Sequence, residues 1–203
     1  MAVSSDFRRR IYIEGGGDRA FLEFLFKRHE IDKDQYSIIE LNGKNGLSAK
    51  VSEIKRSLKG DRERIYIVLD TGKNPYEKKR EKFQDDLRNM HLTQEEYGKI
   101  KLYLWPFNEG CETGVLEDLI NKVSDYDKMA SCLQNFCECI GKECLKQANS
   151  KNKNATNIHL HESWFQLYNE IGVKMGLKPF DHQHKECKKI LKFFDFESDL
   201  MQT

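Results

Sequence analysis

The chain has 203 residues, enough to bury one sizeable core but too few for two full domains. One third of the residues are charged, yet 34 Lys and Arg nearly cancel 33 Asp and Glu. The overall charge therefore does not draw the protein to polyanions, and any affinity for nucleic acid must come from local patches.

Targeting signals are not apparent in the sequence. The first residues, MAVSSDFRRR, lead directly into a strand-like run without the roughly 7–15 apolar residues of a signal peptide. No apolar stretch approaches the roughly 20 residues that cross a bilayer. Four of the six cysteines crowd into residues 132–144 instead of spreading as a disulfide framework would, so we expect reduced thiols. We therefore expect a cytoplasmic protein with no membrane partner.

The chain opens with a strand, a glycine turn and a helix. Residues 10–14 (RIYIE) have the composition of a strand, and the glycines at 15–17 supply a turn with unusual backbone angles. Asp18 is a suitable N-cap for the helix that follows, in which apolar side chains fall at helical spacing from Phe21 onwards.

The same alternation continues further along the chain. Residues 36–41 (YSIIEL) predict a second strand, residues 42–46 a loop, and residues 47–59 an amphipathic helix. Residues 64–70 (RIYIVLD) contain an almost unbroken apolar run, which is typical of a central strand covered on both faces of a parallel sheet.

A fourth strand is predicted at residues 101–105 (KLYLW), where Pro106 ends it. Alternating strands and helices favour an α/β fold with a mostly parallel four-stranded sheet flanked by helices. We expect this α/β core to occupy residues 1–123, and residues 124–203 to form a helical C-terminal extension packed on the core.

Acidic side chains stand where two of these strands end. Glu14 ends the first strand and Asp70 the third, so in a parallel sheet both project at the same edge. Asp18 can fold back across the glycine turn to the same point. Carboxylates packed together repel, and oxygen ligands suit Mg²⁺ or Mn²⁺. The alternative is that these acids serve only as helix caps or turn residues.

Two segments resemble the motifs of the TOPRIM fold. IYIEGGGDRAFLEFL is similar to the first motif, in the Glu-x-x-x-Asp form of nucleases related to the overcoming-lysogenization-defect family. IYIVLDTGKN is similar to the second motif, a hydrophobic strand that ends in Asp-x-Asp. Here Gly72 replaces the second aspartate, so Asn74 or Glu77 would have to substitute for it.

A third segment, WPFNEGCETGVLEDLI, resembles small TOPRIM-like proteins in which a proline after the fourth strand precedes a helix start. Glu117 and Asp118 are the matching acids, and Glu117 is the candidate fourth member of the site. The alternative role for Glu117 is a favourable charge at a helix N-terminus. The resemblance covers residues 10–122, with a weaker match through GLKPFD at 176–181.

The resemblance implies a metal-dependent nuclease that hydrolyses phosphodiester bonds in DNA or RNA. It implies that Glu14 carries proton transfer or ligation, that Asp18 and Asp70 are ligands, and that Glu117 serves a second metal or the water; the catalytic candidates are Glu14 and Asp70. It also implies an effector of a defence or repair system with an ATPase partner. The rival hypothesis, which Gly72 favours, is a degenerate module that binds a protein or nucleic acid without cleaving it.

Phosphate binding requires cations, and four loop lysines are candidates to contact nucleic acid, each of which could equally be a solvated surface charge: Lys44, Lys73, Lys151 and Lys153.

Two further groups of side chains suggest zinc. The crowded cysteines (Cys132, Cys137, Cys139 and Cys144) contain no C-x-x-C pair, and burial in a helical core explains them better. The histidine pairs at 159/161 and 182/184, the second followed by Cys187, make a metal site in the tail conceivable, although such pairs are common by chance.

Overall fold

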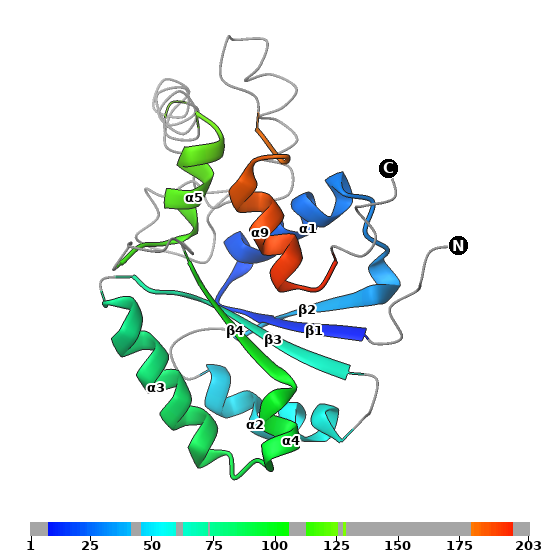
Figure 1. Ribbon diagram of the computed structural model, residues 1–203, viewed down its shortest axis with the longest axis vertical. Helices are drawn as coiled ribbons and strands as arrows, with labels where there is room; N and C mark the ends of the chain where they lie inside the picture. The colour runs from blue at the N-terminus through cyan, green and yellow to red at the C-terminus, as the bar shows by residue number, and fades with distance from the viewer. Residues whose placement is uncertain are drawn as a thin grey trace, which may run out of the picture.

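The computed structural model describes residues 8–41, 46–59, 63–72, 74–105, 113–125, 128 and 180–196. Its centre is a four-stranded sheet with the order β2-β1-β3-β4, in which every neighbouring pair is parallel (Figure 1). The strands are β1 (Arg8–Ile13), β2 (Tyr36–Glu40), β3 (Glu63–Asp70) and β4 (Ile100–Trp105). The predicted α/β fold with a parallel four-stranded sheet is confirmed.

Helices cover both faces of the sheet (Figure 1). One layer holds α1 (Gly16–Arg28), α5 (Leu116–Val123) and α9 (Lys185–Phe193). The other holds α2 (Gly46–Leu58), α3 (Tyr76–Asn89) and the short α4 (Gln94–Gly98). A 3-10 turn, η1 (Lys33–Gln35), leads into β2.

The strand sequences explain the two layers, because successive side chains of a strand point to opposite faces. In β1, Ile11 and Ile13 join the core beneath α1 and α9, whereas Tyr12 joins the core beneath α2 and α3. The central strand β3 divides in the same way, with Tyr66 on the first face and Ile67 on the second. All five side chains are fully buried, as expected for a strand covered on both sides.

One local prediction was wrong, and one helix was missed. Asp18 is not the N-cap of the first helix: α1 begins at Gly16 with Gly15 as its N-cap, and Asp18 is the third helical residue. The side chain still accepts a hydrogen bond from the backbone N–H of Gly15, at 3.0 Å. Helix α4 was not predicted, although Thr93 and Glu96 form the reciprocal capping box that marks a helix start.

The C-terminal helix shares its core with the N-terminal part of the chain. Phe194 and Phe196 are 1% and 0% exposed and pack edge-on against Phe26 of α1. At the other end of α9, the N–H of Asp181 donates to the carbonyl of Val123, the last residue of α5. No helix in the described part of the chain is long and apolar enough to cross a membrane.

Arg9 anchors the chain that follows α9. Its side chain is fully buried, with the guanidinium 4.0 Å from the centroid of the Phe196 ring. It donates hydrogen bonds to the carbonyls of Phe194 and Asp195, the latter at 2.7 Å. These carbonyls lie at the C-terminal end of α9, where backbone acceptors have no partner within the helix. Arg9 therefore attaches the C-terminal segment to β1.

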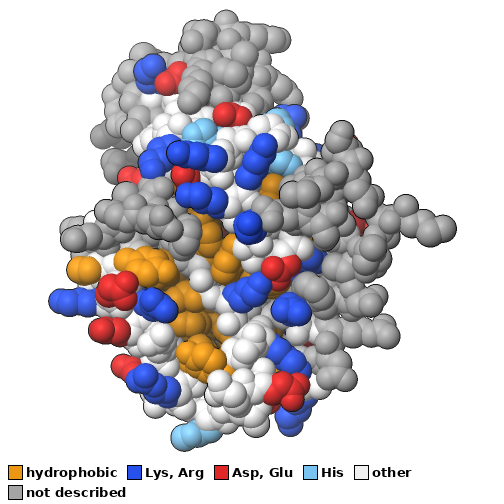
Figure 2. Space-filling view, in the orientation of Figure 1, with side chains coloured by type: hydrophobic (Ala, Val, Ile, Leu, Met, Phe, Trp, Pro, Cys, Tyr) orange, Lys and Arg blue, Asp and Glu red, His pale blue; other side chains and the backbone are white. Residues whose placement is uncertain are grey.

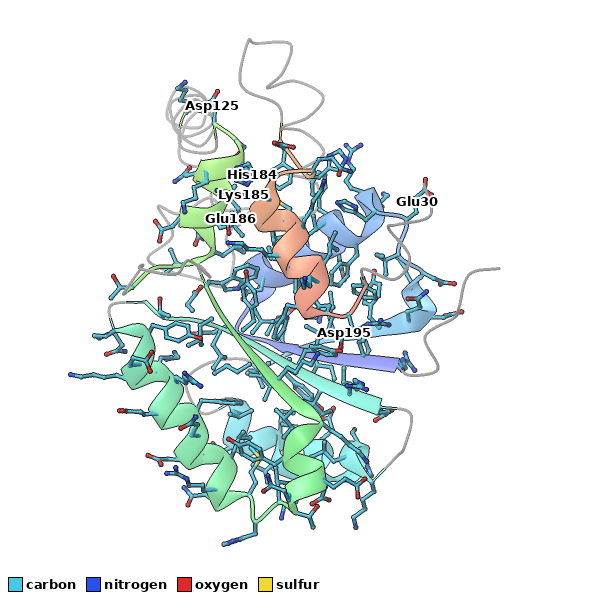
Figure 3. The ribbon with its side chains drawn as sticks, in the orientation of Figure 1. Glu30, Asp125, His184, Lys185, Glu186 and Asp195 are labelled. Atoms are coloured by element: carbon cyan, nitrogen blue, oxygen red, sulfur yellow. The ribbon has the colours of Figure 1, made fainter. Side chains whose placement is uncertain are left out.

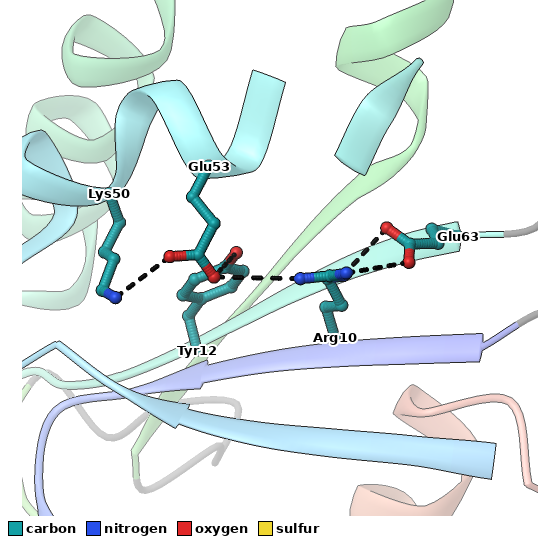
Figure 4. Close-up of polar contacts among 5 residues, drawn as sticks. All are labelled: Arg10, Tyr12, Lys50, Glu53 and Glu63. Carbon is teal, nitrogen blue, oxygen red and sulfur yellow. Dashed lines mark hydrogen bonds and ion pairs between the residues drawn. The ribbon is translucent and has the colours of Figure 1, made fainter. Parts of the chain in front are cut away.

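Arg10, the next residue, belongs to a polar network on the opposite face (Figure 4). Its guanidinium pairs with Glu63 of β3 through two contacts, at 2.8 and 3.0 Å. It also lies 3.8 Å from Glu53 of α2, which accepts hydrogen bonds from Tyr12 and Lys50. The network joins α2 to the sheet. Its charged side chains are partly exposed, so the ion pairs add little to stability.

The two adjacent arginines predict different costs of removal. We expect Arg9→Ala to lower the free energy of unfolding by about 3 kcal/mol, because it leaves buried carbonyls without a donor and opens a cavity. Arg10→Ala should cost under about 1 kcal/mol, since its ion pairs are solvated. Urea unfolding followed by circular dichroism measures both. Equal losses would contradict the anchoring role of Arg9.

Candidate functional site

Glu14 and Asp70 lie together at the carboxyl edge of the sheet. Strands β1 and β3 pair in parallel with Ile13 opposite Val68, so Glu14, one residue further on, and Asp70, two residues further on, lie at the same edge. The carboxylate of Glu14 accepts a hydrogen bond from the backbone N–H of Asp70, at 3.2 Å. The structure therefore brings together the two acids that the strand pattern placed at this edge.

Asp18 approaches the same edge from the first turn of α1 and is only 6% exposed. One carboxylate oxygen accepts from the N–H of Gly15, and the other from the indole N–H of Trp105 at 2.7 Å. Burial raises the pKa of Asp18 to about 6, with added repulsion from Glu14 and Glu117, while the two hydrogen bonds oppose the rise.

Asp70 is the most strongly perturbed acid. Burial raises its pKa to about 7, and the negative charges of Asp18 and Glu14 contribute next. The backbone N–H of Leu116, the first residue of α5, donates to its carboxylate at 3.2 Å and opposes the rise. Glu117 adds a smaller repulsion. Glu14, Asp18, Asp70 and Glu117 thus act on one another electrostatically, and we call them the carboxylate cluster.

A two-residue bridge brings α5 to this edge. The N–H of Gly72 donates to the carbonyl of Gly114 at 2.8 Å, and the N–H of Gly114 returns a bond to Gly72 at 3.1 Å. The Thr71 hydroxyl lies 2.8 Å from the carbonyls of both Trp105 and Gly114 and shares its proton between them. Gly72 has a φ of +60°, which side chains rarely tolerate.

The bridge bears on the missing second aspartate of the Asp-x-Asp motif. Gly72, at that position, serves as a backbone connection. Asn74 and Glu77, the candidate substitutes, are exposed, and no described contact joins either to the carboxylate cluster. Glu117 instead supplies the additional negative charge beside Asp70. The structure thus groups Glu117, not Asn74 or Glu77, with the other acids.

The cluster has the donors for a hard cation, because its side chains offer only oxygen. Among the described residues, no Lys or Arg forms an ion pair with any of the four acids. Nor do three His, Cys, Asp or Glu side chains within these residues already converge on one centre as metal ligands would. The donor types and unneutralised charge fit Mg²⁺ or Mn²⁺, and binding would require the carboxylates to turn toward a common point.

Trp105 is the site residue that the sequence analysis missed. It ends β4 opposite Asp70 in the strand pairing, is fully buried, and donates to Asp18. The strand-end rule that selected Glu14 and Asp70 applies equally to β4, so a polar atom at residue 105 was a usable signal.

Most of the other candidate residues lie outside the described residues. These are the four lysines (Lys44, Lys73, Lys151 and Lys153), the four crowded cysteines, and the histidines at 159 and 161.

The second histidine pair and its cysteine have structural roles. The His184 ring accepts from the N–H of Glu186 and caps α9, and the His182 carbonyl contacts the His29 ring. Burial raises the pKa of the Cys187 thiol to about 12, which disfavours the thiolate that metal ligation needs.

A family model described as "Protein of unknown function (DUF3226)" matches residues 8–196. The chain belongs to this family. The match begins at β1 and ends just after α9, so the family unit contains both the carboxylate cluster and the C-terminal helix. No curated protein and no solved structure matches the chain.

The raised pKa of Asp70 predicts a pH-dependent stability. The folded protein holds this proton up to about pH 7, whereas the ordinary pKa of an aspartate is 3.8, so stability should fall as pH rises between these values. Asp70→Asn removes the ionisation, so we expect it to be more stable than the parent by about 1–2 kcal/mol at pH 8, after allowing for partial solvation. The difference should vanish near pH 4.

Urea unfolding across this pH range measures the effect. Glu77→Gln, an exposed acid outside the cluster, is the control and should not change the pH profile. Parallel profiles for Asp70→Asn and the parent protein would contradict the assigned pKa.

Proposed function

We propose that the protein is a divalent-metal-dependent nuclease of the TOPRIM type, which hydrolyses phosphodiester bonds in DNA or RNA. The observation that supports this most directly is the carboxylate cluster, in which acids from β1, α1, β3 and α5 gather at the carboxyl edge of a parallel sheet. Ligand sites of open α/β sheets lie at this edge. The motif resemblance supplies the reaction class.

The acids have separate roles in this proposal. Asp18, Asp70 and Glu117 would hold Mg²⁺ or Mn²⁺, and Glu14 would ligate or transfer a proton. A bound cation would neutralise charge on the phosphate and activate water. Glu14 is held by the N–H of Asp70, and Asp18 by Trp105, so both side chains are oriented from strand ends that the sheet keeps fixed.

Proton release would accompany metal binding. Asp70 and Asp18, with pKa values of about 7 and about 6, are partly protonated near neutral pH. Ligation requires the charged form, so metal affinity should rise with pH until both acids are ionised. An association with an ATPase partner in a defence or repair system is part of the same proposal and rests on the resemblance alone.

A second candidate function is a non-cleaving module that binds a protein or nucleic acid. Gly72 favours this candidate, because it stands where the motif has a metal-binding aspartate. Its φ of +60° and its place in a backbone bridge are unfavourable for an aspartate. Glu117 is the residue that decides between the two candidates. If it completes the ligand set, the loss at residue 72 is compensated.

Metal binding can be read from Trp105. The chain has two tryptophans, so Trp164→Phe leaves Trp105 as the single reporter, bonded to Asp18. We expect Mn²⁺ to quench its fluorescence with saturation, and Glu117→Gln to weaken the affinity about tenfold or more. The control is the neighbouring variant Asp118→Asn. The Asp118 side chain is exposed and accepts a hydrogen bond from the backbone N–H of Val115, so this variant should bind Mn²⁺ like the parent protein. Equal affinity in both variants would exclude Glu117 as a ligand.

Cleavage is tested on plasmid, single-stranded DNA and tRNA with Mg²⁺ or Mn²⁺. We expect Glu14→Gln and Asp70→Asn each to lower the rate by about 100-fold or more, since each removes a group from the reacting centre. Glu77→Gln, at an exposed residue that no described contact joins to the cluster, should cleave like the parent protein. Binding of a substrate without cleavage under any of these conditions, together with no metal binding, would support the non-cleaving module.

A further inference from the structure

Helix α9 carries a row of lysines along its outer face. The spacing i, i+3, i+4, i+7 places side chains on one side of a helix. The four members are exposed, and we call them the lysine row: Lys185, Lys188, Lys189 and Lys192. The opposite side of α9 is buried, with Cys187, Ile190 and Leu191 in the core. Figure 3 labels Lys185 near the start of α9 and Asp195 just beyond its end.

No exposed acid lies among these lysines in α9. The only acid in α9 is Glu186, which is 5% exposed and pairs with Lys189 at 3.4 Å. Helix α3 is a contrast, because it contains both cations and exposed acids, as in the Arg88–Asp85 pair at 2.8 Å. Like charges three and four residues apart on a helix repel each other, so the row has a cost in helix stability.

Two further cations lie beyond the end of α9, beside an acid. Lys101 of β4 forms an ion pair with Asp195 at 2.7 Å, and the positive charge of the exposed Arg64 of β3 acts on the same carboxylate. In the space-filling view, Lys and Arg side chains gather over the position of α9 and below it, with apolar side chains between them (Figure 2). The net charge of the whole chain is only +1, so the lysine row is a local feature of the surface.

We propose that the lysine row binds the phosphate backbone of a nucleic acid; this proposal rests on the proposed function and names where its substrate is held. A polyanion is repelled by the carboxylate cluster, so a protein that must bring the two together needs cations elsewhere on its surface. At 1.5 Å per residue the row extends about 10 Å, a length of duplex axis over which one strand carries about three phosphates.

An anionic membrane is a poorer match for the same charges. Helices that lie in a membrane interface insert their apolar face among the lipids. The apolar face of α9 is already occupied by the protein core, where Cys187, Ile190 and Leu191 are fully buried. Only the charged face remains for a partner, and a flexible chain of phosphates matches its length and sign.

Oligonucleotide binding measured by fluorescence anisotropy tests the proposal. The probes are labelled single-stranded and duplex 20-mers in EDTA, so that no cleavage takes place. The test variant is Lys185→Gln with Lys188→Gln and Lys192→Gln; Lys189 is retained because it pairs with buried Glu186. The control is Lys78→Gln with Arg80→Gln and Lys82→Gln, which removes three exposed cations from α3.

We expect the α9 variant to bind about 10- to 100-fold more weakly at 0.1 M salt, and the slope of log affinity against log salt to become shallower by about 2–3. The α3 variant should bind like the parent, and both should keep its melting temperature. Equal affinity of the α9 variant and the parent, or equal losses in the two variants, would overturn the proposal. The proposal would also be overturned if the α9 variant lost binding to phosphatidylserine vesicles or polyglutamate but still bound oligonucleotides like the parent protein.

This outcome is separate from that of the proposed function. Weakened oligonucleotide binding by the α9 variant supports the lysine row even if the parent protein cleaves nothing with Mg²⁺ or Mn²⁺. Metal-dependent cleavage with unchanged binding in the α9 variant would support the nuclease and reject the lysine row.

Discussion

The parallel pairing of β1 with β3 is the constraint on which the site depends. It makes two acidic residues leave the sheet at the same edge, close enough for Glu14 to accept the N–H of Asp70. Burial removes water from these carboxylates and disfavours their charged form, so the pKa of Asp70 rises to about 7. Both faces of the sheet are covered by apolar side chains. The unfavourable interactions between carboxylates therefore lie together at one edge, as is common at functional sites.

Much of this arrangement follows from sequence. The apolar run of β3 has almost no polar interruption, so its central position is predictable, and the acids at the strand ends then fall at one edge by topology. The position of Asp18 relative to the helix start was predicted wrongly because Gly16 and Gly17 adopt helical angles, which glycine composition alone does not indicate. The clusters of lysines and cysteines in loops and tail lie beyond the described residues.

Other features depend on contacts between distant segments and leave no local signal. The Gly72–Gly114 bridge joins two loops, and only the folded chain shows that the bridge presents α5 to Asp70. Arg9 likewise gives no hint of burial, since an arginine in the run RRR at residues 8–10 is usually a surface charge. The sequence analysis did not identify the lysine row, whose outward direction depends on the packing of α9.

Helix α5 connects these features in space. Its first N–H holds Asp70, and the carbonyl of its last residue, Val123, accepts the N–H of Asp181 just before α9. Between those two contacts the backbone is an eight-residue helix, which is about 12 Å long. The length of α5 therefore determines how far apart the acidic edge and the start of the cationic face lie, and inserting or deleting a helical turn there would alter that separation while leaving the chemistry of each end intact.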